Sequence, residues 1–181
     1  MYMKIILLRH EERGNDIGFY SSLTENDIIN SYLLSSTLKK LNIDIVFTSP
    51  FIRTMQTIYP YAINNNIKVN VEYGLYEYIH NPYFILNKWY YELDDEKLNI
   101  IVNKKYKSIV NYNDFMVILE DEFNLERRII KFFNYLKTRY NNKTVLLVSH
   151  KGVINKIKDL YYKKTDMNEK FEMGHFEIIN I

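Results

Sequence analysis

The chain has 181 residues, 47% of them hydrophobic, a size at which a single domain buries a core without covalent cross-links. It contains no cysteine, which excludes disulfides, thiolate metal sites and cysteine nucleophiles and favours a reducing compartment such as the cytoplasm. The 24 basic and 22 acidic residues nearly balance, and no apolar run approaches the roughly 18 residues of a membrane span, so neither a nucleic-acid nor a membrane partner is expected. We expect one domain over residues 1–181.

The N-terminal part alternates predicted strands and helices. Lys4–Arg9 is predicted to form a buried strand, and Thr24 to cap a helix that runs to about Leu41, with Asp27 completing a variant capping box. The apolar face expected for this helix consists of Ile28, Ile29, Tyr32, Leu33 and Leu38. A strand at Ile43–Phe47, a helix at about Phe51–Ile63 and a short strand at Val69–Val71 follow.

The middle of the chain, from Gly74 to Tyr112, is the least regular part, and it contains a tyrosine-rich insert at about 79–112. A long helix is predicted from about Asp114 to Tyr140, because apolar residues recur there at helical spacing. The remaining elements are predicted to be a buried strand at Thr144–Val148, a helix at about Val153–Tyr161 and a last strand near Phe176–Ile179.

This alternation of strands and helices predicts an α/β fold, a three-layer α/β/α sandwich around a mostly parallel sheet. In such sheets ligands bind beyond the carboxyl ends of the strands. That rule selects three segments, namely Arg9–His10, Thr48–Arg53 and Ser149–His150.

The residue types in these segments suit phosphoryl transfer through a histidine. Guanidinium groups such as those of Arg9 and Arg53 offer paired donors to a phosphoryl dianion and remain charged. The same positive charge disfavours a protonated imidazole at His10, which must be neutral to act as a nucleophile. The helices that begin near Phe51 and Gly152 add their N-terminal dipoles.

Three short motifs carry a resemblance to a known family. They are Leu8-Arg9-His10, the run from Phe47 to Thr57 that reads FTSPFIRTMQT, and Val148-Ser149-His150-Lys151-Gly152. In order and spacing the chain resembles the histidine phosphatase superfamily, which includes the cofactor-dependent phosphoglycerate mutases. Leu23-Thr24-Glu25 also resembles the start of that family's first helix.

The resemblance implies a phosphoglycerate mutase-like fold and a set of roles. His10 would be the nucleophile that becomes phosphohistidine, and a phosphate pocket would be formed by Arg9, Arg53, His150 and Arg13. Some family members place the general acid directly after the second histidine, but Lys151 stands there. Glu77, in the sequence Gly74-Leu75-Tyr76-Glu77-Tyr78, matches the other pattern and would act first as an acid and then as a base.

One residue departs from the family pattern, because Glu11 stands where a glycine usually follows the first histidine. From the resemblance as a whole we expect a metal-independent phosphomonoester hydrolase without a cofactor. Its substrate is expected to be a small phosphorylated molecule or a phosphoprotein. Two alternatives stay open: mutase-type phosphoryl transfer, and an inactive domain that binds a phosphorylated ligand or a partner. The oligomeric state is left open as well.

Overall fold

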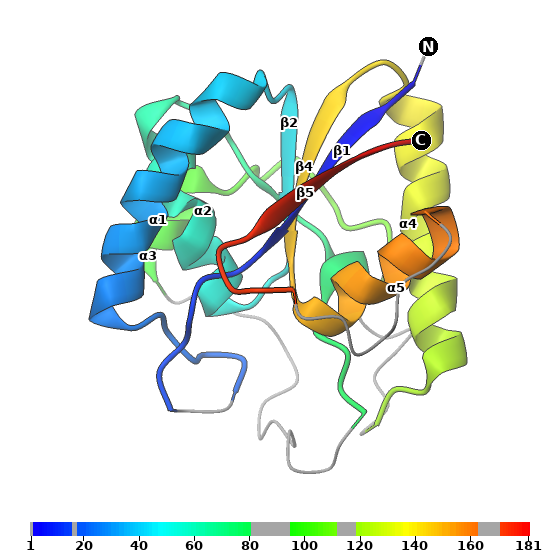
Figure 1. Cartoon of the computed structure of the whole chain (residues 1–181), viewed down its shortest axis with the longest axis horizontal. Helices are drawn as coiled ribbons and strands as arrows, with labels where there is room; N and C mark the ends of the chain where they lie inside the picture. The colour runs from blue at the N-terminus through cyan, green and yellow to red at the C-terminus, as the bar shows by residue number, and fades with distance from the viewer. Residues whose placement is uncertain (1, 16–17, 81–94, 112–118, 163–170) are drawn as a thin grey trace.

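A computed structural model describes residues 2–15, 18–80, 95–111, 119–162 and 171–181 (Figure 1). Strands and helices alternate along most of the chain. In chain order the elements are β1 (Lys4–Arg9), α1 (Glu25–Leu38), η1 (Lys39–Leu41), β2 (Ile45–Thr48), α2 (Ile52–Asn64), β3 (Asn70–Val71), η2 (Tyr73–Leu75), α3 (Glu96–Ile101), α4 (Glu122–Arg139), β4 (Thr144–Ser149), α5 (Lys151–Tyr162) and β5 (Phe176–Asn180).

The five strands form one sheet in the order β3-β2-β4-β1-β5. All neighbouring strands are parallel except β1 and β5, which pair antiparallel. Arg9 lies opposite Ser149 in the register of β1 and β4, so the residues that follow these two strands leave the sheet at the same edge. The predicted mostly parallel α/β fold is confirmed.

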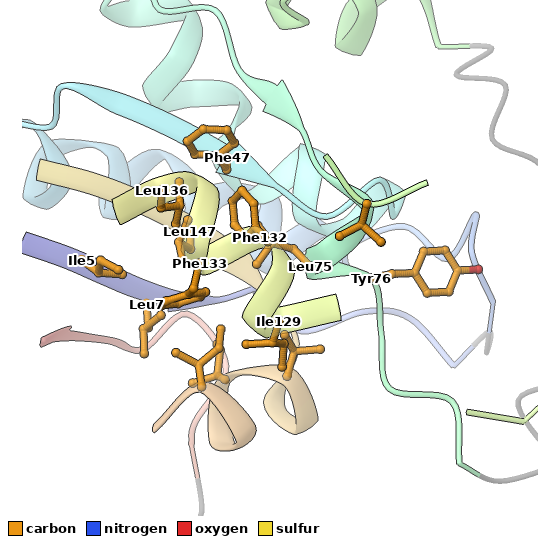
Figure 2. Packing of buried hydrophobic residues seen from close by; sticks show 14 of the residues in the cluster. Ile5, Leu7, Phe47, Leu75, Tyr76, Ile129, Phe132, Phe133, Leu136 and Leu147 are labelled. Atoms are coloured by element: carbon orange, nitrogen blue, oxygen red, sulfur yellow. The ribbon is translucent and has the colours of Figure 1, made fainter. Parts of the chain in front are cut away.

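Each central strand contributes alternate side chains to two hydrophobic cores, as the period of a strand requires. On one face Ile5, Leu7, Phe47 and Leu147 pack against Ile129, Phe132, Phe133 and Leu136 of α4 (Figure 2). On the other face Ile6, Leu8, Val46 and Leu146 pack against Met55 and Ile58 of α2 and Leu98 of α3. The two cores complete the predicted three layers and fix the carboxyl edge of the sheet.

The predicted apolar face of the first helix is wrong for four of its five residues. Leu38 is buried, but Ile28, Ile29, Tyr32 and Leu33 are exposed. The face that packs against α2 carries Ser31 and Ser35 instead, and both are buried. Small side chains allow the two helices to approach closely, which turns the larger apolar residues outward.

The long helix begins later than predicted. Asp121 is its N-cap and accepts a hydrogen bond from the Asn124 backbone nitrogen at 2.7 Å, so α4 starts at Glu122. Residues 114–118 of the predicted helix lie outside the described residues, as do 81–94 and 112 of the predicted insert. Among the helices that the structure describes, none is both long and apolar enough to cross a membrane.

Candidate active site

Two histidines meet at the carboxyl edge of the sheet. His10 follows β1 and His150 follows β4, and their ring centroids lie 5.1 Å apart in an edge-on arrangement. The His10 backbone nitrogen donates to the Ser149 carbonyl at 3.1 Å, which extends the pairing of the two strands to the first histidine. Both side chains are buried. The pairing of β1 with β4 sets the spacing between the two histidines.

The hydrogen bonds of His10 define its tautomer. Its Nδ1 lies 2.6 Å from the Glu11 carbonyl oxygen, which can only accept, so Nδ1 carries the proton. Nε2 therefore holds a lone pair and accepts a hydrogen bond from Nε of Arg53 at 3.2 Å. Burial, together with the positive charge of Arg53 and the nearby His150, lowers the pKa of His10 well below its usual value. The imidazole is neutral at neutral pH, with its lone pair in the site.

His150 is held as a neutral imidazole as well. Its Nδ1 lies 3.1 Å from Oε2 of Glu77, and its Nε2 lies 2.8 Å from the hydroxyl of Ser49. Burial lowers the pKa of His150 to about 4, although the Glu77 carboxylate acts in the opposite direction. Ser49 is a site residue that sequence reasoning did not single out, although it stands in one of the three selected strand-end segments.

Arg53 links the parts of the site. It lies in the first turn of α2, is 4% exposed, and its guanidinium carbon lies 4.3 Å from the centre of the Phe51 ring. Besides its bond to His10, it donates to the Gly18 carbonyl at 2.9 Å and to Glu77 at 3.3 Å. Burial lowers the pKa of Arg53 to about 10, so the group stays charged at neutral pH.

The structure brings two further predicted arginines toward the same region. Arg9 donates through Nη1 to the Phe171 carbonyl, while its buried Nε has no hydrogen-bond partner among the described residues. Arg13 donates to the Gly14 carbonyl at 3.1 Å, and its charge contributes to lowering the pKa of both Arg9 and Arg53. Three guanidinium groups around two neutral imidazoles make a site that favours an anion.

Glu77 lies at the mouth of this arrangement, with 23% of its side chain exposed. One carboxylate oxygen, Oε2, contacts both Arg53 and His150, and the other accepts from the Tyr78 backbone nitrogen at 3.1 Å. Burial alone would raise the pKa of Glu77. The interactions with His150 and Arg53 outweigh burial and hold that pKa below its usual value. The resting site therefore contains a carboxylate.

A buried ion pair holds the backbone that carries Glu77. Arg128 of α4 binds Glu120 through two hydrogen bonds of 2.7 and 2.8 Å, and both residues are buried. The same guanidinium donates to the Gly74 carbonyl at 2.7 Å and to the Glu77 carbonyl at 3.5 Å. Sequence reasoning missed Arg128. The available signal was its position three residues after Leu125 and four before Phe132, which places a charged residue on the apolar face of the helix.

A second buried carboxylate holds the other end of the same segment. Glu72 is fully buried and accepts hydrogen bonds from the backbone nitrogens of Gly74, Ile109 and Val110 at 2.8, 2.9 and 3.2 Å. It also accepts from the Tyr106 hydroxyl and, at 2.9 Å, from the Ser108 hydroxyl. Glu72 therefore ties residues 106–110 to the start of the segment that carries Glu77.

The Glu11 carboxylate lies against Gly174. A methyl group added at Gly174 would lie 2.4 Å from both carboxylate oxygens, so the side chain lies against that glycine. Its backbone nitrogen donates to the Thr57 hydroxyl at 3.0 Å, and its backbone does not have the positive φ that would require a glycine. Burial, with a smaller contribution from Asp27, raises the pKa of Glu11 to about 7. The backbone at this position therefore accepts Glu11 in place of the glycine that is usual in the family, and the space beside Gly174 holds its side chain.

Three possible metal ligands gather in this site. Ligand atoms of His10, Glu77 and His150 all lie within 4.8 Å of one another. The Arg53 guanidinium lies among them, within hydrogen-bonding distance of each. A fixed positive charge at that point disfavours a metal cation and favours a phosphoryl group.

Comparison with known proteins identifies a sequence relative and structures of the same fold. Phosphoserine phosphatase 1 from Hydrogenobacter thermophilus is 27% identical over 165 residues, which cover 82% of this chain and 71% of that protein. The α-ribazole phosphatase of Shigella flexneri has the same fold, with a TM-score of 0.69 at 20% identity over 99% of this chain and 91% of that one.

A mycobacterial glucosyl-3-phosphoglycerate phosphatase, crystallised with VO3, also shares the fold. Its TM-score is 0.67 at 15% identity, over 97% of this chain and 92% of that one. Residues 5–177 match the family described as "Histidine phosphatase superfamily (branch 1)". Since this match spans nearly the whole sequence, the chain belongs to the histidine phosphatase superfamily.

Proposed function

We propose that this chain hydrolyses phosphate monoesters through a phosphohistidine formed on His10, without a metal ion. The observation that carries the proposal is the neutral His10 imidazole, whose Nε2 lone pair faces the Arg53 guanidinium. Nε of Arg9 supports a nearby oxyanion, because this buried donor has no acceptor among the described residues and such a donor is costly.

In the first half-reaction, the phosphoryl group binds against Arg9, Arg53 and His150. Nε2 of His10 attacks phosphorus while the ester P–O bond breaks, and the leaving oxygen takes a proton from Glu77. The phosphoryl dianion competes for Arg53 and adds negative charge beside the carboxylate. Both effects raise the pKa of Glu77 and allow it to hold the proton that the leaving group needs.

In the second half-reaction, Glu77 takes a proton from a water molecule that attacks the phosphohistidine. The P–N bond breaks, phosphate leaves and His10 returns to its neutral form. The arginines stabilise the spread negative charge in both transition states, because their positions and charges are set before the substrate arrives.

A small phosphorylated metabolite is the substrate class that we propose. Relatives and structural neighbours include phosphatases named for phosphoserine, α-ribazole and glucosyl-3-phosphoglycerate, all of them small molecules. We place the activity in the cytoplasm, since a chain with no cysteine suits a reducing compartment.

The test is turnover of p-nitrophenyl phosphate in the presence of EDTA between about pH 5 and 8, a range that brackets the titration of imidazole. We expect turnover that survives EDTA and falls by ~10³-fold or more in His10→Ala. Asn134→Ala, at an exposed residue of α4 outside the candidate active site, is the control and should keep its rate. Absence of turnover by folded wild-type protein at every pH would contradict the proposal, as would full activity of His10→Ala.

A further inference from the structure

The outward face of α1 carries an apolar stripe. Ile28, Ile29, Tyr32 and Leu33 are 41, 61, 50 and 67% exposed, while the opposite face of the helix packs on α2. Figure 1 shows α1 on the outer side of α2, farther from the sheet than α2 is. A contiguous group of large apolar side chains on a helix surface marks an interaction site.

The ends of this stripe carry opposite charges. At 100° per residue, Glu25, Ile29, Ser36 and Lys40 fall on one arc of the helix and its 3-10 extension, and all four are exposed. The acidic residue lies in the first turn, and Lys39 and Lys40 lie beyond the last turn. The midpoint between residues 25 and 40 falls between Tyr32 and Leu33, at the centre of the apolar stripe.

This pattern is self-complementary about a two-fold axis. If two copies of α1 lie antiparallel with the axis between Tyr32 and Leu33, Glu25 of each copy faces Lys40 of the other. The apolar residues then meet in the middle, and the helix dipoles run in opposite directions. A membrane surface is a poorer match, because an interfacial helix carries a basic polar face rather than one charge of each sign at its two ends.

A groove beside the stripe widens the surface available to a second copy. It has a volume of about 270 Å³, and its wall combines the apolar Ile28, Pro60 and Leu98 with two tyrosines and with polar or charged side chains, namely Tyr32, Tyr59, Ser31, Gln56, Asp95 and Lys97. Apolar side chains from the opposing helix can enter this groove. The helix itself is only ~21 Å long, so the contact is smaller than a standard interface and the dimer is expected to be weak.

We propose that this protein forms a weak homodimer through an antiparallel, two-fold pairing of α1. The proposal does not depend on the catalytic activity, because the residues of the stripe are not part of the candidate active site. Sedimentation velocity on the full chain, from roughly 1 to 300 µM, should give a mass that rises from 22.0 kDa toward twice that value.

Two sets of variants test the interface and its register. Leu33→Asp should weaken dimerisation at least ~10-fold, because it places two carboxylates beside the axis. Phe123→Asp, at a 68% exposed apolar residue of α4, should leave dimerisation unchanged. Glu25→Lys and Lys40→Glu should each weaken self-association several-fold, since each replaces two attractive contacts by two repulsive ones. An equimolar mixture of these two variants should recover the wild-type affinity.

Each of these measurements can contradict the proposal. A single 22.0 kDa species at every concentration would overturn it, and so would a dimer that withstands Leu33→Asp. Failure of the mixture to recover association would overturn the antiparallel register. Turnover of p-nitrophenyl phosphate by dilute Leu33→Asp protein should equal that of the wild type, which separates this inference from the proposed activity.

Discussion

The histidine pair and the segment that carries Glu77 form one site but are held in place differently. His10 and His150 each follow a strand whose backbone is paired along its length, so the ladder between β1 and β4 sets their spacing. Glu77 follows a short 3-10 turn, and its segment is held by three buried charged side chains: Glu72 at its start, and Arg128 and Glu120 from a distant part of the chain. The nucleophile is therefore positioned by regular structure and the acid by a network.

The Glu77→Gln variant should distinguish the roles of these two regions most clearly. The histidine pocket should still accept a phosphoryl group from p-nitrophenyl phosphate, because p-nitrophenolate leaves without a proton. Breakdown of the phosphohistidine should slow by roughly 10²-fold or more, because water loses its base. Stopped-flow absorbance should show a burst of one p-nitrophenolate per chain followed by a slow steady state.

Glu96→Gln, at an exposed acidic residue of α3, is the control for that variant and should show wild-type turnover. If Glu77→Gln lost the burst together with the steady state, Glu77 would be needed to build the histidine pocket. The separation drawn between the two regions would then be wrong.

Removal of Arg128 should break the network that holds the acid. Arg128→Met leaves the Glu120 carboxylate buried without its partner, which should reduce the free energy of unfolding by about 3–5 kcal/mol in urea titrations. The double variant Arg128→Met with Glu120→Leu should recover most of that stability, because an apolar pair replaces the ion pair.

Activity should not recover with stability in the double variant. The carbonyls of Gly74 and Glu77 still lack their donor, so we expect a fall in kcat, with little change in KM, of roughly tenfold. The double variant should keep the burst of p-nitrophenolate. General damage to the structure would reduce the burst as well as kcat. Wild-type kcat in the stable double variant would show that Arg128 has no part in positioning Glu77.

The smallest expected effect is the pH dependence contributed by Glu11. Because the folded state raises the pKa of Glu11 to about 7, this residue favours folding most below the pKa of an unfolded glutamate, about 4.5. That contribution is lost progressively as the pH rises toward 7 and stays lost above it.

We therefore expect the free energy of unfolding of Glu11→Gln, measured relative to that of the wild type, to increase by about 1–3 kcal/mol from pH 5 to pH 8. Urea titrations at the two pH values measure this difference. Glu12→Gln, at the exposed neighbouring residue, should show no such trend. A constant difference between Glu11→Gln and wild type at both pH values would argue against a buried carboxyl group at residue 11.

Sequence patterns were most informative where a strand or a capped helix has a local cause. The predicted strand Lys4–Arg9 matches β1 at both ends, and Thr24 caps α1 by accepting a hydrogen bond from the Asp27 backbone nitrogen, as expected. The motifs also predict a site that contains His10, Arg53, His150 and Glu77, and the structure places these four side chains in contact around Arg53. Their roles in catalysis stay predictions.

Tertiary structure decided which face of each helix is buried. On α4 most apolar residues face the core, although Phe123 is exposed, because the sheet offers this helix a surface of large side chains such as Phe47 and Leu147. On α1 the apolar periodicity and the core disagree, because the neighbouring helix is approached through Ser31 and Ser35 and the apolar residues face outward. Periodicity shows that a helix has an apolar side and says nothing about which neighbour lies on it.

The sequence by itself determined the order of strands and helices and the strand-end motifs, because each depends on residues close together in the chain. Only the tertiary structure showed that Glu72, Arg128 and Glu120 hold the segment of Glu77, and that Glu11 turns toward Gly174. Those contacts join residues as far apart as Glu11 and Gly174. They form when distant segments pack together, and no local pattern encodes them.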